Sequence, residues 1–384
     1  MPIEVSLPEG VPLLTTCYMY ITGGCNLACR HCWITPTFER EGGTGQCLDY
    51  ELYKIAIEEA IPLGLRNIKF TGGEPLLHPD FVAMVDYATE KGLQTWLETN
   101  GTLITDQLAH YLKDNTSLDS ISVSLDGATA ATHEYMRSVP GSFEMARRGI
   151  IYLVEAGYSP QVIMSLYPGN VDEIESLVHW AEEVGCGTVK FNVIQPSGRA
   201  IQMAKCQDFL SIEGLVELGR YVEKDLQNRV SVSLIFGWSR AFHGIRRLSD
   251  RTGDACKIHN ILGILATGQL SMCGIGTEET DLIYGHLGRD RLAEIWTTHP
   301  VLVKLRDTIP SRLEGICSQC LLKVACLGGC LAQNYHTYRR LTAPFWFCQL
   351  ADEAGMFPSS RRRRIDSHSD GASEKFKISE EASK

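Results

Sequence analysis

The sequence contains no run of apolar residues long enough to cross a membrane, and its first residues lack the basic segment of a secretory signal. Basic residues are also scarce. The 36 Lys and Arg are outnumbered by 46 Asp and Glu, so the net charge of −10 gives no general attraction for nucleic acid or an anionic membrane. No internal repeat is visible. We therefore expect a cytoplasmic protein with neither a nucleic-acid nor a membrane partner.

The composition is that of a globular protein, with 44% hydrophobic and 21% charged residues in 384, a length that predicts two to three domains. Between residues 15 and 236, short β-rich runs alternate with amphipathic stretches, as in a parallel sheet with crossover helices. Asp106 and Ser142 stand where helix N-caps are expected. Strands are predicted at 17–22, 67–70, 94–99, 120–125, 161–166 and 188–193. Helices are predicted near 50–62, 80–91, 106–114, 142–156 and 171–184.

Six such units predict an α/β fold whose sheet curls into a complete or a partial barrel, and we favour a partial (β/α)6-type barrel. The loops at the C-terminal strand ends would then carry the chemistry. A helix at 211–228, a strand at 230–236 and a hairpin at 261–266 and 270–273 are predicted to follow. The expected parts are a lead-in (1–14), the barrel (15–236), a linker (237–253), a small cysteine-rich C-terminal domain (254–357) and a disordered polar tail (358–384).

Fourteen cysteines are the unusual feature, and without an export signal they favour metal ligands over disulfides. Three of them follow the first predicted strand as Cys25-x3-Cys29-x2-Cys32. A zinc site usually has four ligands in paired spacings, whereas three thiolates on a [4Fe–4S] cluster leave one iron open to a small molecule. The motif TGGEP (71–75) follows the second predicted strand. Its glycines allow close backbone approach, and Glu74 can accept a hydrogen bond from an ammonium group.

The cysteine loop after strand one and TGGEP after strand two resemble the signature of the radical S-adenosylmethionine (SAM) enzymes. The resemblance implies that a cluster on Cys25, Cys29 and Cys32 takes the amino and carboxylate groups of S-adenosylmethionine. An electron from a donor such as flavodoxin or ferredoxin would release a 5′-deoxyadenosyl radical, which abstracts hydrogen from the substrate. Glu74 as a helix cap and Arg137 as a surface charge remain alternatives. The implied cofactor contacts are Gly72, Gly73, Glu74, Ser124, Arg137, Asn170 and Asn192.

The last third of the chain holds seven cysteines that resemble the SPASM extension, which carries two auxiliary [4Fe–4S] clusters and would bring the total to three. The resemblance implies an open iron or a non-cysteine ligand on the first auxiliary cluster, and Asp254 and His259 are the candidates. A pair of structural zinc sites is the alternative. By resemblance, Cys256, Cys273 and Cys330 bind the first auxiliary cluster, and Cys317, Cys320, Cys326 and Cys348 bind the second.

Two further cysteines are candidates for catalysis. Cys206 lies beyond the last predicted barrel strand and Cys47 follows the cluster loop, so either would be able to donate a hydrogen atom to a substrate radical, as in some epimerases of the family. His31 lies between the cluster cysteines and is expected to serve packing.

The resemblance covers residues 17–348 and is specific for the fold and cofactors, but not for the substrate. Family members with a SPASM region mostly modify peptides or proteins, so we expect a maturase that cross-links, epimerises or oxidises a ribosomally made precursor. Because Cys25 comes early, the precursor's leader would be recognised by a separate protein, by the barrel itself or not at all. The alternatives are an enzyme acting on a sugar or alcohol and a non-enzymatic iron–sulfur protein.

Overall fold

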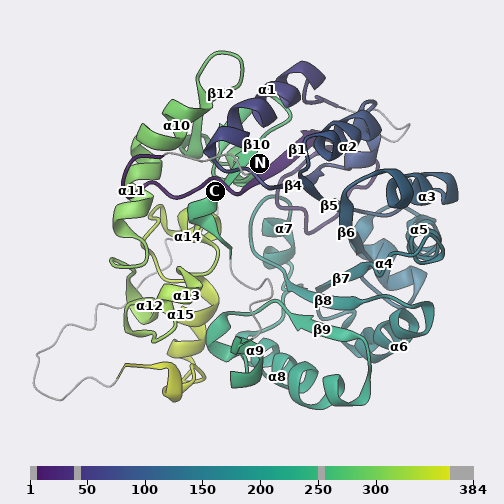
Figure 1. Cartoon of the computed structure of the whole chain (residues 1–384). Helices are drawn as coiled ribbons and strands as arrows, with labels where there is room; N and C mark the ends of the chain where they lie inside the picture. The colour runs from purple at the N-terminus through teal and green to yellow at the C-terminus, as the bar shows by residue number, and fades with distance from the viewer. Residues whose placement is uncertain (1–6, 39–44, 250–255, 364–384) are drawn as a thin grey trace, which may run out of the picture.

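The computed structural model describes residues 7–38, 45–249 and 256–363, and a curved sheet of ten strands organises them (Figure 1). Seven neighbouring strands pair in parallel, in the order β1-β4-β5-β6-β7-β8-β9. These strands are β1 (Thr16–Thr22), β4 (Asn67–Gly72), β5 (Gln94–Thr99), β6 (Leu118–Ser124), β7 (Gln161–Leu166), β8 (Thr188–Val193) and β9 (Ser233–Phe236). The predicted partial barrel is therefore confirmed, and β9 extends it.

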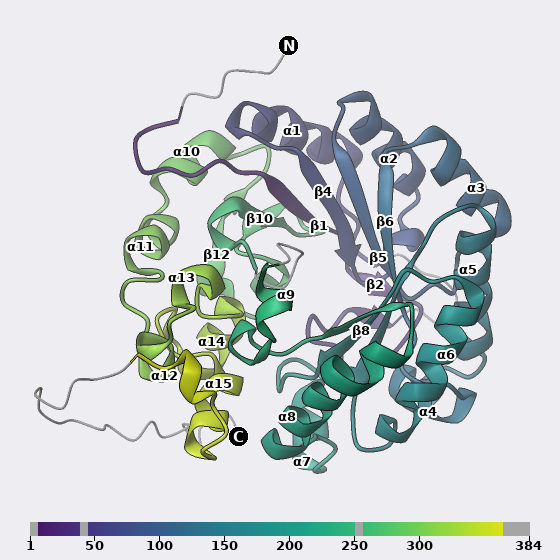
Figure 2. The ribbon, with the colours of Figure 1, turned by 60° about the horizontal axis from the view of Figure 1, so that its bottom comes forward.

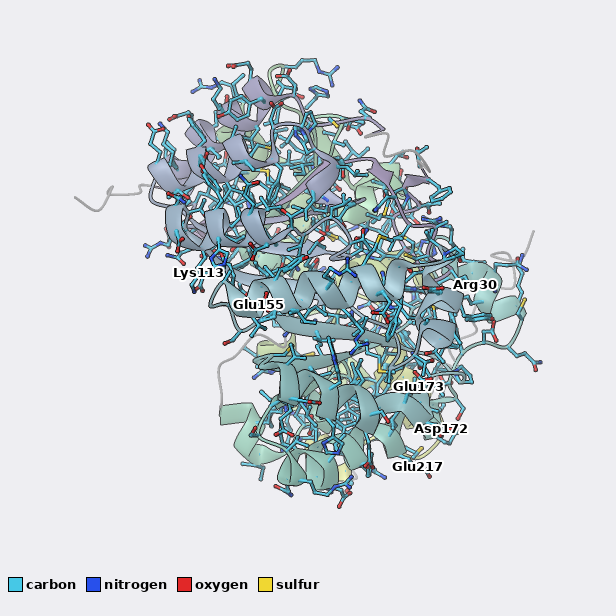
Figure 3. The ribbon with its side chains drawn as sticks, turned by 90° about the vertical axis from the view of Figure 1, so that its right-hand side faces the viewer. Arg30, Lys113, Glu155, Asp172, Glu173 and Glu217 are labelled. Atoms are coloured by element: carbon cyan, nitrogen blue, oxygen red, sulfur yellow. The ribbon has the colours of Figure 1, made fainter. Side chains whose placement is uncertain are left out.

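Helices cover the outer face of the curved sheet (Figure 2). Their apolar faces pack on the strands, while exposed charged residues such as Lys113, Glu155 and Glu217 project outward (Figure 3). The helices of this part are α1 (Tyr50–Ala60), α2 (Phe81–Glu90), α3 (Asp106–Asn115), α4 (Ala130–Arg137), α5 (Ser142–Glu155), α6 (Ile174–Val184), α7 (Ala200–Lys205), α8 (Ile212–Tyr221) and α9 (Ile245–Ser249). No helix among the described residues is long and apolar enough to cross a membrane.

Two local predictions were wrong, and one helix was not predicted. The cap of α3 is Thr105, whose hydroxyl accepts from the Leu108 N–H, rather than Asp106. Ser142 is the first residue of α5, and Gly141 precedes it in the left-handed conformation. Helix α4 was not predicted, because a short segment with little apolar periodicity gives a weak sequence signal.

The C-terminal region joins the barrel sheet rather than forming a separate sheet. The predicted hairpin is confirmed in β10 (Ile261–Ile264) and β11 (Gln269–Ser271), and β12 (Ile283–His286) pairs beside it. Strand β10 also pairs in parallel with β1, so that Thr16 faces Ile261 and Met19 faces Ile264. The sequence does not predict this pairing, since it joins segments about 245 residues apart.

Short helices follow the hairpin and lie beside the open side of the barrel, where α15 contacts α8 (Figures 1 and 2). A two-stranded sheet of β2 (Gly24–Cys25) and β3 (Thr37–Phe38) lies at the cluster loop. The C-terminal helices are α10 (Leu292–Thr298), α11 (Pro300–Thr308), α12 (Gly315–Gln319), α13 (Lys323–Cys326), α14 (Leu331–Tyr338) and α15 (Trp346–Glu353).

The predicted disordered tail is wrong for its first residues, 358–363. The Leu321 N–H donates to the Arg361 carbonyl, and the Arg363 N–H donates to the Gln319 carbonyl. These bonds fix the segment against the helices that carry the cysteines. The rest of the predicted tail, 364–384, lies outside the described residues. Asp254 and residues 250–253 of the predicted linker also lie outside them.

Gly263 in β10 provides a test of this architecture. A Cβ at this position would lie 2.6 Å from the Cα and 2.8 Å from the carbonyl carbon of Cys273, so backbone would have to move. We predict that Gly263→Ala destabilises the protein by about 1–3 kcal/mol, as overpacking does. Gly244→Ala, where a Cβ meets nothing within 4 Å, serves as the control. Equal unfolding midpoints in denaturant for both variants would contradict the predicted close approach.

Candidate active site

The predicted cluster cysteines lie in one cavity of about 220 Å³ at the C-terminal ends of the barrel strands. Cys25, Cys29 and Cys32 all line it as free thiols. Burial raises the pKa of Cys25 to about 12 and also raises that of Cys29, so binding of a metal cluster as thiolates must release protons. The structure brings five of the predicted cofactor contacts to the same wall: Gly72, Gly73, Ser124, Arg137 and Asn192.

Backbone contacts with the TGGEP turn hold the start of the cluster loop. The Gly73 N–H donates to the Thr22 carbonyl and the Glu74 N–H to the Gly24 carbonyl, each at 2.9 Å. A Cβ on Gly73 would lie 1.9 Å from the Gly24 carbonyl oxygen, so only glycine allows this approach. The two glycines thus let strand-end backbone pack directly on the start of the cysteine loop.

Glu74 is not among the residues that line the cavity, and its predicted contact with a ligand stays a prediction. The side chain is fully buried. It accepts from the Thr99 hydroxyl at 2.6 Å, the Asn100 N–H at 2.8 Å and the Leu76 N–H at 3.2 Å. These donors draw the carboxylate into the protein because a buried charge needs hydrogen-bond partners. Burial nevertheless raises its pKa to about 7.

The capping alternative for Glu74 describes part of its role, since Leu76 belongs to the short helical turn that follows. The larger part of its role is to fix the positions of two strand ends relative to each other. Glu74 links the end of β4 to the end of β5, where Thr99 and Asn100 do line the cavity.

Arg137 is buried at the end of α4 and forms an ion pair with the fully buried Asp126, with Nε 2.7 Å from Oδ2. Its Nη1 also lies 3.5 Å from the Cys29 sulfur. Burial alone would raise the pKa of Asp126, but the Arg137 guanidinium, together with His31, His133 and the Ser165 N–H, outweighs burial and lowers it. The alternative of an exposed surface charge is therefore wrong, although Arg137 already has a partner within the protein.

Two predicted residues lie elsewhere. Asn170 is fully buried and serves the backbone: its amide donates to the carbonyls of Asp126 and Ser165, and its oxygen accepts from the Tyr167 N–H. Cys206 follows α7 on the surface, where Gln202 donates to its sulfur at 3.8 Å. Neither residue lines the cavity: Asn170 lies in the turn after β7, and Cys206 ends α7.

Sequence reasoning missed the contribution of α4 to the site. Its last-turn carbonyls accept from the cysteine loop, with Ala28 N–H bonded to Arg137 O and Arg30 N–H to Met136 O. Arg30 also stacks over the Tyr135 ring at 4.0 Å. The orphan carbonyls of a helix end thus fix the loop that carries Cys29.

Arg199 was missed as well. It lines the cavity, and its backbone N–H donates to the Cys32 carbonyl at 2.9 Å. Two guanidinium nitrogens, Nε and Nη2, are buried without a hydrogen-bond partner among the described residues. His31 lines the same wall with Nε2 3.3 Å from the Ser165 hydroxyl, and burial lowers its pKa to about 4.

The seven C-terminal cysteines line three cavities, and their division between two clusters stays a prediction. Cys273 and Cys330 line one cavity, and Cys256, Cys326 and Cys330 line the next. Cys317, Cys320, Cys326 and Cys348 line the third, which is small. Within the described part of the chain, no three His, Cys, Asp or Glu side chains are placed to hold a single metal ion.

Residues 19–181 match the family model described as the Radical SAM superfamily. This part of the chain is a radical SAM domain. The chain is 28% identical over 351 residues to the AdoMet-dependent heme synthase of Oleidesulfovibrio alaskensis, covering 87% of each protein. It is also 28% identical over 369 residues to the mycofactocin maturase MftC of Mycobacterium ulcerans, covering 92% of this chain and 93% of that protein.

Solved structures share the fold of this chain. Streptococcus suis SuiB bound to the precursor peptide SuiA superposes with a TM-score of 0.69 at 17% identity, covering 88% of this chain and 76% of SuiB. The enzyme anSMEcpe with bound AdoMet and the Cp18Cys peptide gives a TM-score of 0.67 at 17% identity, covering 89% and 96%. At these identities the likeness establishes the fold alone.

The buried Asp126–Arg137 pair yields a prediction about the stability of the radical SAM domain. Arg137→Met leaves Asp126 buried without its counter-charge and should destabilise the protein by about 3–5 kcal/mol. The double variant Asp126→Asn/Arg137→Met should cost less than the sum of the two single variants, because neither charge is then left unpaired. Denaturant unfolding of all three variants measures this coupling.

The control is Lys54→Met, which removes an exposed ion pair with Glu51 and should change stability little. If the loss of stability in the double variant equals the sum of the losses in the two single variants, the pair is not coupled as its geometry indicates.

Proposed function

We propose that this radical SAM enzyme binds three [4Fe–4S] clusters and S-adenosylmethionine and modifies a ribosomally made peptide. The observation that carries the proposal is the shared cavity system. Three thiols and polar strand ends meet in one cavity, which adjoins a second cavity lined by Cys273 and Cys330. Free cysteine thiols are the donor set that iron–sulfur clusters require, so the residues present fit these groups.

The relatives support a peptide substrate. MftC is a mycofactocin maturase, SuiB was solved with a precursor peptide, and anSMEcpe was solved with a peptide and AdoMet. When bound, the cluster and S-adenosylmethionine would supply radical chemistry that removes a hydrogen atom from the substrate. The modification itself (cross-link, epimerisation or oxidation), an electron donor such as flavodoxin or ferredoxin, and a separate leader-binding protein are part of the same proposal.

The protein's own residues would bind and orient the cofactor. Cys25, Cys29 and Cys32 would hold the cluster, while Gly72 and Gly73 would present backbone to the methionyl end. Polar groups on other strands and at helix ends would fix the remaining parts of the cofactor, and the two unpartnered nitrogens of Arg199 would add donors for a carboxylate. These residues are Ser124, Asn192, Arg137 and Arg199.

A tetrapyrrole substrate is the second candidate. Three AdoMet-dependent heme synthases at 28% identity cover 82–87% of this chain, and a Fe-coproporphyrin III synthase is 30% identical over 226 residues. The radical SAM domain and the cysteines would be shared by both functions, so assays with a peptide and with a tetrapyrrole distinguish them.

The cluster count is the first test. After anaerobic reconstitution we predict about twelve iron per chain, the sum of three four-iron clusters. Replacing Cys25, Cys29 and Cys32 together with Ala should leave about eight iron and abolish formation of 5′-deoxyadenosine with dithionite. Cys206→Ala, at an exposed thiol outside the cavity, should retain both properties. A wild-type value near four iron would exclude the auxiliary clusters.

The substrate is the second test. The enzyme is co-expressed with the short open reading frames beside its gene, and the peptides are analysed by mass spectrometry. We expect a mass change in one peptide that disappears with the triple cysteine variant. Conversion of iron coproporphyrin III by the reduced enzyme, with every peptide unchanged, would instead establish the tetrapyrrole function.

A further inference from the structure

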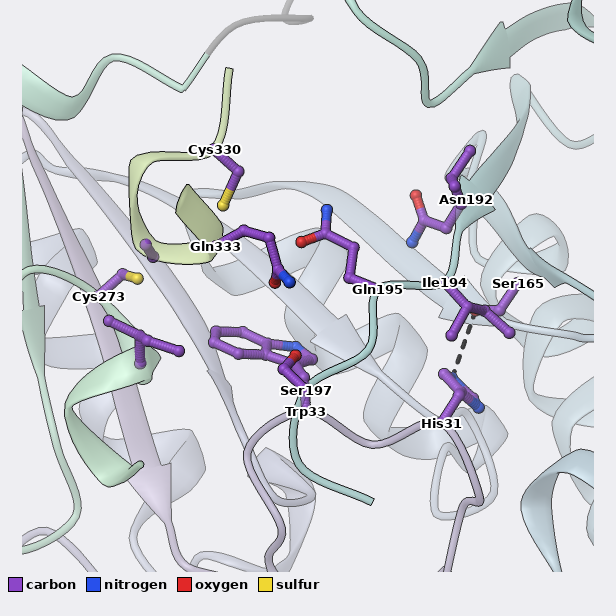
Figure 4. Close-up of a pocket in the computed structure, with 13 residues that line it drawn as sticks. His31, Trp33, Ser165, Asn192, Ile194, Gln195, Ser197, Cys273, Cys330 and Gln333 are labelled. Carbon is purple, nitrogen blue, oxygen red and sulfur yellow. Dashed lines mark hydrogen bonds between the residues drawn. The ribbon is translucent and has the colours of Figure 1, made fainter. Parts of the chain in front are cut away.

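A second pocket adjoins the cofactor cavity, which is the cavity lined by Cys25, Cys29 and Cys32 (Figure 4). It lies between that cavity and the first auxiliary cysteine group, which consists of Cys256, Cys273 and Cys330. At one end it shares four residues with the cofactor cavity: His31, Trp33, Ser165 and Asn192. At the other end it reaches Cys273 and Cys330. Any group held in this pocket therefore lies beside the bound cofactor and beside the first auxiliary cysteine group.

The lining combines apolar side chains with carboxamides. Ile194 and Ile275 supply apolar wall, and the indole of Trp33 is held edge-on against Tyr20, with ring centroids 6.4 Å apart. The carboxamides of Gln195 and Gln333 extend toward each other from opposite sides of the pocket (Figure 4). Gln195 comes from the loop after β8, whereas Gln333 is a buried residue of α14.

The lining carries no Lys, Arg, Asp or Glu among the described residues. The adjoining cavity, which shares Gln195 and Cys330 with this pocket, does contain Lys190 and Arg240. The lack of charged side chains is thus a property of this pocket and not of the whole cavity system. Burying a carboxylate without a counter-charge is costly, so the lining disfavours an anionic group.

We propose that this pocket binds the target residue of the peptide, an uncharged apolar side chain whose flanking backbone amides pair with Gln195 and Gln333. A carboxamide offers both a donor and an acceptor, which is what a peptide N–H and C=O require. Trp33 and the two isoleucines supply the apolar contact surface. This inference rests on the proposed peptide function and narrows it to one class of target residue.

The test uses a photoreactive probe on the reconstituted enzyme with S-adenosylmethionine and without reductant. The probe is N-acetyl-Gly-photoleucine-Gly-amide, whose diazirine inserts into neighbouring residues on irradiation. We expect adducts within residues 33, 192–197 and 330–333, identified by peptide mapping. N-acetyl-Gly-Leu-Gly-amide should suppress the labelling at a concentration at least tenfold lower than its Gly-Asp-Gly counterpart. Adducts elsewhere, or equal competition by the two peptides, would overturn the proposal.

Variants test the two carboxamides. Gln195→Ala should lower labelling about fivefold while iron content is retained, and the double variant Gln195→Ala/Gln333→Ala should lower it further. Gln94→Ala, an exposed glutamine at the start of β5 and thus at the opposite end of the strands, is the matched control. Because Gln333 is buried, the single Gln195 variant keeps the test valid if the double variant fails to fold. Unchanged labelling in Gln195→Ala would contradict the assignment.

The outcomes also separate this inference from the proposed function. Adducts outside the pocket, in an enzyme that still modifies a co-expressed peptide, contradict the pocket alone. Displacement of pocket adducts by iron coproporphyrin III, with no effect of the leucine peptide, contradicts the peptide function itself.

Discussion

Backbone pairing between β1 and β10 holds together the two parts of the chain that carry the cysteines. Strand β1 leads into the loop of Cys25, while β10 and β11 lead into Cys273. A parallel ladder fixes the register of both segments, so the cofactor cavity and the first auxiliary group face each other at a set separation. Gly263 allows the backbone of Cys273 to approach β10 within this arrangement. Without the pairing, the two cysteine regions would have no common wall.

The cysteine loop is held from three sides by groups that have no role in cluster ligation. The TGGEP turn donates backbone hydrogen bonds to the start of the loop, α4 accepts bonds from its middle, and Arg199 donates to its end. The Asp126–Arg137 pair fixes the end of α4 in turn. Such support matters because a radical must be generated at a fixed distance from its target. Displacement of the reacting groups lowers the reaction rate.

The cavities change character along their length. The cofactor cavity contains the charged residues Arg137 and Arg199, the next pocket has a largely apolar and uncharged lining, and the third contains Lys190 and Arg240. The proposed recognition of the cofactor by charge and of the substrate by apolar contact would thereby be separated in space. A peptide and a carboxylate-bearing tetrapyrrole would place their charged groups in different parts of the cavity system. The difference in lining therefore helps to distinguish these two candidate substrates.

The sequence by itself determined the elements with strong local signals: strands such as Gln94–Thr99 and the strand-end position of TGGEP, both readable from patterns of a few residues. It also placed Cys25, Cys29 and Cys32 on one loop. Only the tertiary structure decided that β10 joins β1, that Glu74 turns inward to Thr99 and Asn100, and that Asn170 and Cys206 lie outside the cavity. The physical reason is that local periodicity follows from nearest neighbours in the chain, whereas side-chain direction and strand partnership depend on hydrogen bonds between segments far apart in it.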